Sequence, residues 1–352
     1  MPAFDRYHRQ MLLPGFDAAA QAALGRATVL LVGCGALGTV IADMLTRAGV
    51  GRLRIVDRDL VELTNLQRQV LFTEADAAGH VPKAVAAAER LALVNDDVTI
   101  EPHVVDFTHR NAVPLATDVD LLLDGTDNFA TRLLLNDLAI AHALPYVYGG
   151  AVGTTGTVYP ILPSTEATAG PCLRCLLGDE PETGQLGSCD TVGVLGPAAG
   201  IVANFQAAEA LKILTGNLAA VSRSLLSFDL MTNRIQQMDV AAARSETCPC
   251  CGARDFEFLE GRRAVRSATL CGRGAVQLHP ANGEGPTVQL DHLARQLAAH
   301  GQATANEYLL RATLHDGGHD YRLTLFADGR AIIHGTENPT TARSLYTRYV
   351  GL

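Results

Sequence analysis

The sequence of 352 residues contains no tryptophan, and aromatic residues make up only 5% of it. A carbohydrate site built on tryptophan rings is therefore excluded. Long apolar runs are also absent, since none approaches the roughly 20 residues that a helix needs to cross a bilayer. The first nine residues contain no continuous apolar stretch of the kind that directs export. We therefore expect a cytoplasmic protein with no membrane partner.

Basic residues are too few to favour nucleic acid as a partner. The chain has 28 Lys and Arg against 37 Asp and Glu, and its formal net charge of −9 argues against a surface for nucleic acid or anionic lipid. Hydrophobic residues make up 48% of the chain, enough to bury a large core, and the length suits two domains. Eight cysteines are too few for a disulfide framework, and their occurrence in pairs indicates thiolates in a reducing cytoplasm.

Short apolar runs alternate with helical patterns in the first half of the sequence. Strands are expected at residues 27–32, 52–56, 98–104, 119–123 and 146–149, and helices at residues 38–48, 83–94 and 129–143. This alternation predicts an α/β fold with a doubly wound, mostly parallel, Rossmann-like sheet. Residues 149–196 are typical of a hairpin with functional loops, and a helix at 197–215 and a strand at 225–230 follow.

The composition changes after Gly252, where a charged stretch begins. We therefore predict a larger domain, residues 1–252, and a small α+β domain, residues 253–352, whose role the sequence does not reveal. The small domain is expected to contain strands at 275–278 and 308–314, helices at 290–300 and 340–349, and a hairpin at 321–334.

A glycine motif, Gly33-x-Gly35-x-x-Gly38, lies between the first strand and its helix. Glycines at this spacing let the backbone approach a pyrophosphate, and the helix N-terminus favours its negative charge. Asp57 ends the next strand, where a carboxylate can accept hydrogen bonds from ribose hydroxyls. Alone, this pattern is typical of NAD or FAD sites and also of plain tight turns. No Gly-Lys-Ser or Gly-Lys-Thr follows the motif, which disfavours a P-loop kinase or ATPase.

Three charged residues further along the chain favour nucleotidyl transfer over hydride transfer. Arg68 follows Asn65 by three residues, so both lie on one face if this segment is helical. Lys83 begins a helix, and Asp127 follows a strand at the sheet edge where ligands of such folds bind. Cations can neutralise a triphosphate, and a carboxylate can hold Mg²⁺. The alternative is that Arg68 and Lys83 are solvated surface charges and that Asp127 caps a helix.

Several segments occur in the order of one known family: Arg6-Tyr-His-Arg9-Gln, the glycine motif, Thr64-Asn-Leu-Gln-Arg68, Pro82-Lys83, Thr126-Asp-Asn128, two cysteine pairs and Cys189-Asp-Thr-x-Gly. Over roughly residues 5–252 the chain thus resembles the ThiF/MoeB-type adenylyltransferases, bacterial relatives of ubiquitin-activating enzymes, and is most similar to the ThiF type. The resemblance implies an enzyme that uses ATP to adenylate the C-terminal glycine of a ubiquitin-like sulfur carrier ending in Gly-Gly, either ThiS-like or MoaD-like. Pyrophosphate is released, and the pathway is thiamine or molybdopterin biosynthesis.

The resemblance also implies roles for individual residues. Asp57 would hold the ribose, Asn65, Arg68 and Lys83 would contact the phosphates, and Asp127 would bind Mg²⁺. The full set expected at the nucleotide comprises Gly33, Gly35, Ala36, Gly38, Asp57, Thr64, Asn65, Leu66, Gln67, Arg68, Lys83, Asp127 and Asn128.

The resemblance further implies a homodimer, in which Arg9 of one subunit reaches the triphosphate bound to the other. One departure from the family is Ala36, where many relatives have a second glycine. Alanine is the smallest replacement, so a backbone contact to the nucleotide can survive it. The attacking carboxylate is already ionised near neutral pH, and no general base is required. The sequence agrees, since we find no Ser-His-Asp or His-Glu-x-x-His array.

The cysteine pairs Cys172-x-x-Cys175 and Cys248-x-x-Cys251 have the spacing of a tetrahedral structural Zn²⁺ site. The alternative is a group of incidental buried thiols. Cys250 could compete with its neighbours, but only Cys248 and Cys251 are separated by two residues. We therefore predict a zinc ion that stabilises the C-terminal part of the larger domain.

Cys189 lies in a glycine-containing segment before the helix at 197–215. In relatives a cysteine here can accept the activated acyl group or join in sulfur transfer; the alternative is a thiol with no obligatory role. Some relatives end in a rhodanese domain, whose reactive cysteine lies in a loop that opens a helix. Cys271 precedes a loop and a strand instead, so we expect a separate sulfurtransferase or cysteine desulfurase to donate the sulfur.

Three alternative functions remain from the sequence alone. An NAD(P)-dependent oxidoreductase would use the glycine motif and Asp57, but it has no need for Arg68, Lys83 and Asp127. An adenylating dehydratase that modifies tRNA is disfavoured by the acidic charge and by Cys189. The third alternative is a binding scaffold that has kept the fold without the activity.

Overall fold

The computed structural model describes residues 5–163, 170–178, 192–263, 268–270, 274–278, 288–298, 301–316 and 318–350. The chain forms two compact units, Met1–Ala264 and Val265–Leu352, each with its own hydrophobic core. This division comes later than the boundary expected after Gly252, because Phe258 is buried in the core of the first unit. Within the described residues, no helix is long and apolar enough to cross a membrane.

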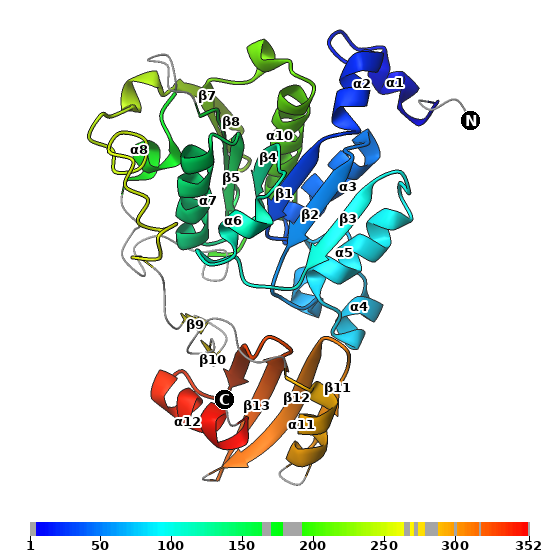
Figure 1. The fold of residues 1–352 in the computed structure, drawn as a ribbon, viewed down its shortest axis with the longest axis vertical. Coiled ribbons are helices and arrows are strands. Elements are labelled where there is room, and N and C mark those ends of the chain that lie inside the picture. The colour runs from blue at the N-terminus through cyan, green and yellow to red at the C-terminus, as the bar shows by residue number, and fades with distance from the viewer. Residues whose placement is uncertain are drawn as a thin grey trace. The chain divides into compact units, whose positions relative to one another are not determined.

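The first unit is built on an eight-stranded sheet with the order β3-β2-β1-β4-β5-β6-β7-β8 (Figure 1). The first five strands of this order, β3, β2, β1, β4 and β5, are parallel to one another. Strands β6, β7 and β8 continue the sheet in antiparallel pairs. The strands are β1 Thr28–Val32, β2 Arg52–Val56, β3 Thr99–His103, β4 Leu121–Asp124, β5 Tyr146–Val152, β6 Thr155–Ile161, β7 Ser224–Asp229 and β8 Arg234–Asp239. The prediction of a mostly parallel sheet is confirmed.

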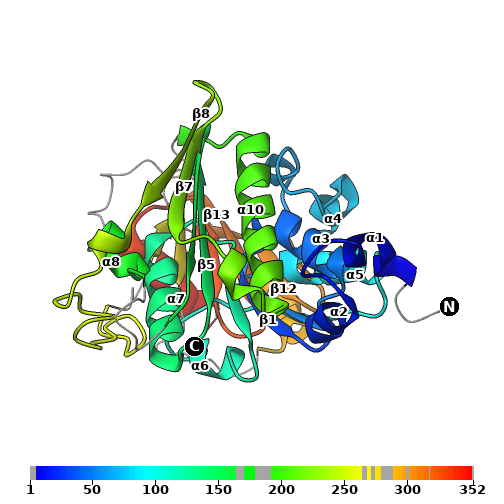
Figure 2. The same ribbon diagram turned by 90° about the horizontal axis from the view of Figure 1, so that it is seen from above.

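Helices cover both faces of this sheet. The main ones are α3 (Gly38–Ala48), α5 (Lys83–Ala92), α7 (Phe129–His142) and α10 (Gly196–Leu214). Because successive strand residues point to opposite faces, Val29 and Leu31 of β1 share a core with α3, α5 and α10, whereas Leu30 and Val32 share one with α7. Figure 2 shows α10 and α3 on one side of the strands and α7 on the other.

Strand order reverses at β1, because the chain runs from β1 to β2 and β3 on one side and then returns to β4 on the other. The turns that follow β1, β2 and β4 therefore meet at one end of the sheet, which we call the carboxyl edge. Ligands of open parallel sheets bind at such a reversal. Shorter elements complete the unit: η1 Asp5–Tyr7, α1 His8–Met11, α2 Ala18–Leu24, η2 Leu63–Asn65, α4 Glu74–Gly79, α6 Ala112–Leu115, α8 Leu173–Leu177, η3 Leu218–Ala220 and η4 Ala241–Ala243.

The second unit contains a six-stranded antiparallel sheet with the order β11-β12-β13-β14-β10-β9. Two helices pack on it through residues such as Leu293 and Leu345, which share a core with Leu310 and Leu323. Its elements are β9 Ala268–Leu270, β10 Ala275–Leu278, α11 Leu290–Leu297, β11 Ala303–Ala305, β12 Leu309–Asp316, β13 His319–Phe326, β14 Ala331–His334 and α12 Pro339–Tyr349. The expected strand at 308–314 and hairpin at 321–334 correspond to β12 and to β13–β14, whereas the pairing of β12 with β13 was not predicted.

Candidate nucleotide site and metal centre

The turns that follow β1 and β4 touch each other at the carboxyl edge. Gly33 has a φ of +89°, and a Cβ there would collide with the backbone of Gly125. A Cβ on Gly38 would collide with the carbonyl of Gly33. Gly35 is different, because the nearest atom to its Cβ position is Gln69 Nε2 at 3.8 Å. Two of the motif glycines are therefore required by backbone packing, and the third leaves room for a ligand to approach the turn.

A carboxylate anchors the glycine turn, and a second one holds a lysine beside it. Asp57 Oδ2 accepts the backbone N–H of Cys34 at 2.6 Å, and Asp57 Oδ1 accepts that of Asp59 at 2.7 Å. Lys83 Nζ donates to Asp59 Oδ2 at 2.9 Å, and the Lys83 side chain is only 7% exposed. The structure thus places Asp57 and Lys83, both expected at the nucleotide from the resemblance, at this edge of the sheet. The sequence did not predict the bridging role of Asp59.

The charges at this edge act on one another. Burial lowers the pKa of Lys83, but the carboxylates of Asp59, Asp57 and Asp127 raise it by more, so the pKa stays above its usual value and the ammonium stays charged. The same three carboxylates, together with Asp106, raise the pKa of Arg58 against the effect of its burial. Carboxylates next to a fixed cation are suited to binding a metal–phosphate complex.

The turn at the end of η2 contains three polar residues, Asn65, Arg68 and Gln69. The carbonyl of Asn65 accepts the backbone N–H of Arg68 at 3.1 Å and that of Gln69 at 3.0 Å, so the three residues belong to one tight turn. Asn65 is buried, and Arg68 is half-buried. Gln69, which the sequence did not single out, is 4% exposed, and its Oε1 has no hydrogen-bond partner among the described residues. A buried amide oxygen without a partner, on a side chain whose Nε2 lies near Gly35, lacks a donor that a ligand or water could supply.

Asp127 lies in the turn between β4 and α7. Its side chain is exposed, whereas the preceding Thr126 is buried. Asn128 Oδ1 accepts the backbone N–H of Thr131 at 2.9 Å, so Asn128 and not Asp127 caps α7. The alternative that Asp127 is a helix cap is therefore wrong. Its carboxylate faces solvent at the carboxyl edge, within electrostatic range of Lys83.

Arg9 lies at the opposite end of the sheet. It is an exposed residue of α1, and the neighbouring Gln10 Nε2 donates to the carbonyl of Ala48, the last residue of α3. Since α3 begins at Gly38 beside the glycine turn and has 11 residues, about 16 Å of helix separates its two ends. The structure therefore does not bring Arg9 to the other predicted site residues of its own chain.

The remaining predicted residues lie in the glycine turn, in or next to η2, or outside the described part of the chain. Thr64 and Gln67 are exposed, and Leu66 and Ala36 are half-buried, beside the residues described above. Cys189 lies outside the described residues.

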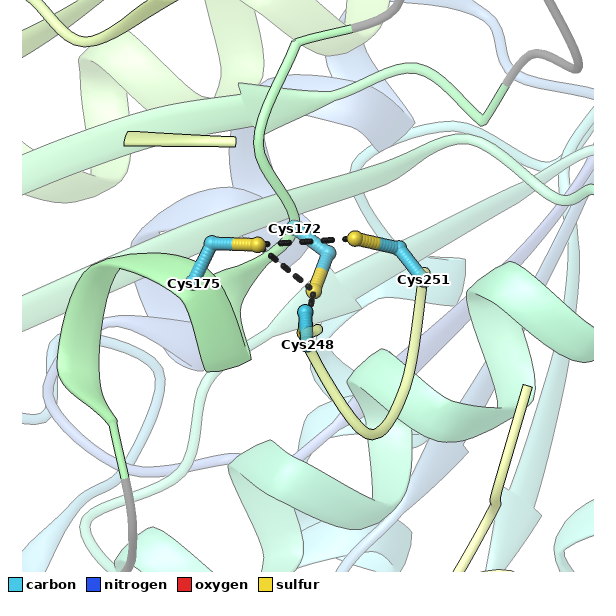
Figure 3. Close-up of side chains that lie close together, drawn as sticks. All are labelled: Cys172, Cys175, Cys248 and Cys251. Carbon is cyan, nitrogen blue, oxygen red and sulfur yellow. Dashed lines mark hydrogen bonds between the residues drawn. The ribbon is translucent and has the colours of Figure 1, made fainter. Parts of the chain in front are cut away.

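Four cysteine sulfurs gather beside α8, as the spacing predicts (Figure 3). The Sγ atoms of Cys172, Cys175, Cys248 and Cys251 all lie within 4.8 Å of one another. The separations are 3.9 Å for Cys172–Cys175, 3.7 Å for Cys172–Cys248 and 3.4 Å for Cys175–Cys251. Tetrahedral Zn²⁺ with Zn–S bonds of about 2.3 Å requires sulfurs about 3.8 Å apart. The four residues therefore fit a zinc ion in number, chemistry and spacing.

Helix α7 holds both cysteine pairs. Asn136 Oδ1 accepts the backbone N–H of Leu173, which lies between Cys172 and Cys175, at 2.8 Å. Asn136 Nδ2 donates to Sγ of Cys250, which lies between Cys248 and Cys251, at 3.1 Å. Asp137 Oδ2 accepts the backbone N–H of Phe258 at 2.9 Å. Cys250 thus pairs with a helix side chain and is not one of the four gathered sulfurs.

Comparison with known proteins gives a family and close relatives. The ThiF family matches residues 7–250. The sulfur carrier protein ThiS adenylyltransferase of Bacillus subtilis is 41% identical over 347 residues, which cover 98% of this chain and 99% of that protein. The sulfur carrier protein adenylyltransferase of Thermus thermophilus is 40% identical over 269 residues, 76% of this chain and 96% of that protein. The adenylyltransferase and sulfurtransferase MOCS3 of Danio rerio is 38% identical over 74% of this chain but only 57% of its own length.

Solved structures with the same fold include that of Escherichia coli MccB with ATP, which superposes with a TM-score of 0.61 at 21% identity and covers 71% of this chain and 75% of that one. PaaA superposes with a TM-score of 0.55 at 20% identity and covers 67% of this chain and 82% of that one. At these identities the likeness is one of fold alone.

Proposed function

The chain belongs to the ThiF family and is an adenylyltransferase, and we propose that its substrates are ATP and the C-terminal glycine of a ubiquitin-like sulfur carrier that ends in Gly-Gly. Activation of such carriers serves thiamine and molybdopterin biosynthesis. The match to the Bacillus subtilis relative over nearly the whole of both chains favours a ThiS-like carrier as the first to test.

The observation that carries this proposal is the charge arrangement at the carboxyl edge. A fixed ammonium, Lys83, lies beside the glycine turn, with the exposed carboxylate of Asp127 in electrostatic range. In the proposed complex Asp57 holds the ribose, and Arg68, Asn65 and Lys83 contact the phosphates. Hydride transfer to a nicotinamide needs no such cluster, whereas a triphosphate with a bound cation does.

The reaction needs positioning more than proton transfer. A carboxylate oxygen of the carrier attacks the α-phosphorus of ATP, the bond from that phosphorus to the bridging oxygen breaks, and pyrophosphate leaves. The α-carboxylate has a pKa of about 3.3–3.7 and is ionised at neutral pH, so no base is required. Arg68 and Lys83 offset the negative charge of the phosphates. Mg²⁺ bound through Asp127 would supply further charge neutralisation for the leaving group.

We propose that Arg9 acts on the other subunit of a homodimer. Its position at the far end of α3 supports this, because about 16 Å of helix lies between it and the glycine turn of its own chain. The four-cysteine cluster is proposed to hold a structural zinc ion. Because unpaired thiolates persist in a reducing compartment, the cluster supports a cytoplasmic location.

The activity is assigned to the first unit. The Thermus thermophilus relative carries the name of the same activity, and the 269 matched residues cover 96% of it, so that protein has no room for a counterpart of the second unit. No sulfurtransferase motif is found in the sequence of the second unit, and we propose that a separate sulfurtransferase or cysteine desulfurase supplies the sulfur.

The function is tested by incubating the protein with ATP, Mg²⁺ and purified ThiS-like or MoaD-like carriers. We expect the mass of one carrier to increase by one adenylyl group, and pyrophosphate exchange into ATP to depend on that carrier. Calorimetry is expected to detect binding of ATP with Mg²⁺ and none of NAD. Tight NAD binding without ATP binding would instead support the oxidoreductase alternative.

Cys189→Ala separates adenylation from acyl capture. Adenylation uses the nucleotide site alone, whereas capture of the activated acyl group needs a nucleophile such as a thiolate. We expect the variant to form the carrier adenylate at the wild-type rate and to lose any thiol-sensitive covalent adduct with the carrier, as measured by mass spectrometry. If wild type forms no adduct and the variant supports normal sulfur transfer, Cys189 has no obligatory role, and the adenylation proposal is unaffected.

A further inference from the structure

A buried polar network lies directly behind the turn that carries Asp127. Asp124, the last residue of β4, is fully buried, and its Oδ1 accepts both the backbone N–H of Thr126 at 2.9 Å and the Thr126 hydroxyl at 2.7 Å. Its Oδ2 accepts the hydroxyl of Tyr146 at 3.0 Å. A buried carboxylate is stable only when its charge is matched, so this network requires a cation.

Arg132, one turn into α7, supplies that cation. Its Nε lies 3.3 Å from Asp124 Oδ2, and its Nη2 donates to the carbonyl of Thr126 at 2.8 Å. The guanidinium also lies over the rings of Phe129 and Tyr148, each 5.5 Å from its centroid. The side chain is 9% exposed. Arg132 thus contacts Asp124 and Thr126, the residues on either side of Gly125, and lies over two rings.

The other side of the turn is also fixed. Gln206 Nε2, from α10, donates to the carbonyl of Asp124 at 2.8 Å and to that of Val147 at 3.1 Å. Gly125 packs so closely on Gly33 that a Cβ would collide with the Gly33 carbonyl. Contacts from α7, β5, α10 and the glycine turn therefore converge on the three residues before Asp127, although none of these contacts involves its carboxylate.

We propose that Arg132 is a positioning residue for the adenylation reaction, which holds the turn Asp124–Asp127 so that the Asp127 carboxylate meets the metal–triphosphate complex. This inference rests on the proposed function. Supports of this kind behind a metal ligand typically change metal affinity or activity by about 10–100-fold when they are removed. Arg132 also contributes charge, since Asp124 and Asp127 both act to raise its pKa against the effect of burial.

Lysine cannot replace arginine in this role. The guanidinium forms an ion pair with a carboxylate through Nε and donates to a backbone carbonyl through Nη2, two nitrogens of one planar group, and it lies over two rings. An ammonium keeps the charge but is a single point that cannot make both contacts in the same geometry. Arg132→Lys therefore tests position rather than charge.

The experiment measures carrier-dependent pyrophosphate exchange by the full-length protein as a function of Mg²⁺ concentration. We expect Arg132→Lys to raise the Mg²⁺ concentration for half-maximal rate by about tenfold or more, with a smaller loss of rate at saturating Mg²⁺. Tyr146→Phe removes one hydrogen bond to Asp124 and keeps the ring, so it should shift the Mg²⁺ dependence in the same direction by less. The Mg²⁺ dependence of Tyr146→Phe still tests the proposal if Arg132→Lys does not fold.

Arg54→Lys is the matched control. Arg54 also pairs with a carboxylate, Glu101 at 2.8 Å, and donates to a carbonyl, that of Leu115 at 2.6 Å, but it has no contact with the turn. Its Mg²⁺ dependence should equal that of wild type. The proposal is overturned if Arg132→Lys and Tyr146→Phe lower only the melting temperature and leave the Mg²⁺ dependence unchanged. Failure of the proposed function would look different, because wild type itself would then show no carrier-dependent exchange.

Discussion

Asp127→Ala is expected to lower the rate of carrier-dependent pyrophosphate exchange by about a hundredfold or more. The carboxylate is exposed and makes no cap for α7, because Asn128 has that role. Its removal should therefore leave the fold intact while it takes away the proposed Mg²⁺ ligand from the carboxyl edge. The rate is measured at saturating ATP, carrier and Mg²⁺, and the fold is checked by thermal unfolding without nucleotide.

Two further variants make this result specific. Asp127→Asn keeps the shape and removes the charge, so it should lose nearly as much activity as Asp127→Ala. Asp120→Asn is the control, because Asp120 lies at the other end of β4 and its Oδ2 accepts the backbone N–H of Thr28 at 2.8 Å, a bond that the Asn oxygen can keep. Wild-type exchange in both Asp127 variants would mean that the metal ligand has been assigned to the wrong residue.

The parallel part of the sheet could be predicted from the sequence because its strands are buried on both faces. β1 and β4 are runs in which every residue is buried, so they appear as continuous apolar segments followed by a turn. β8 was missed for the opposite reason. All six of its residues are exposed, so it has neither an apolar run nor an alternation, and only its pairing with β7 defines it.

The charged residues of the candidate site stand at places that the local sequence pattern marks. Asp57 and Asp127 follow strands, and Lys83 opens a helix. The residues that hold them could not be predicted. Asp59 reaches Lys83 across 24 positions of sequence, and Tyr146 reaches Asp124 across 22. Such pairs are selected by how strands and helices pack, and no local pattern records them.

Arg9 shows what the structure adds to a resemblance. The resemblance implies that Arg9 of one subunit reaches the triphosphate bound to the other, and the fold agrees, because the glycine turn of its own chain is at the far end of α3. The sequence position, some 24 residues before the glycine motif, gives no indication of this separation.

Cys251→Ser is expected to have the largest effect on stability. We expect wild type to contain about one zinc ion per chain and the variant to contain far less, with a loss of unfolding free energy on the order of 5 kcal/mol. Zinc content is measured by elemental analysis after removal of loosely bound metal, and stability by denaturant unfolding. Treatment of wild type with a strong chelator should lower its stability in the same direction.

The size of this effect follows from how little else holds the cysteine segments. The buried residues around the cluster are Cys172, Cys248 and Cys250, with Ile140 and Phe256 partly buried against them, so the local apolar core is small. Four thiolates brought within 4.8 Å of one another repel unless a cation binds them. A bound zinc ion would therefore offset both the small core and the repulsion between the thiolates. Without one ligand, the second cysteine segment should separate from the first.

Cys250→Ala tests whether the effect belongs to the metal or to any buried thiol in this segment. Cys250 is as buried as Cys172, and its substitution removes contacts of the thiol with Asn136 Nδ2 at 3.1 Å, with the Asn136 carbonyl at 4.0 Å and with Asp137, but it is not one of the four gathered sulfurs. It should keep its zinc and most of its stability. Equal zinc content in Cys251→Ser and wild type would refute the four-cysteine site. Since a closed site of four thiolates leaves no position open for a substrate, whatever part of Cys251→Ser remains folded should still form the carrier adenylate.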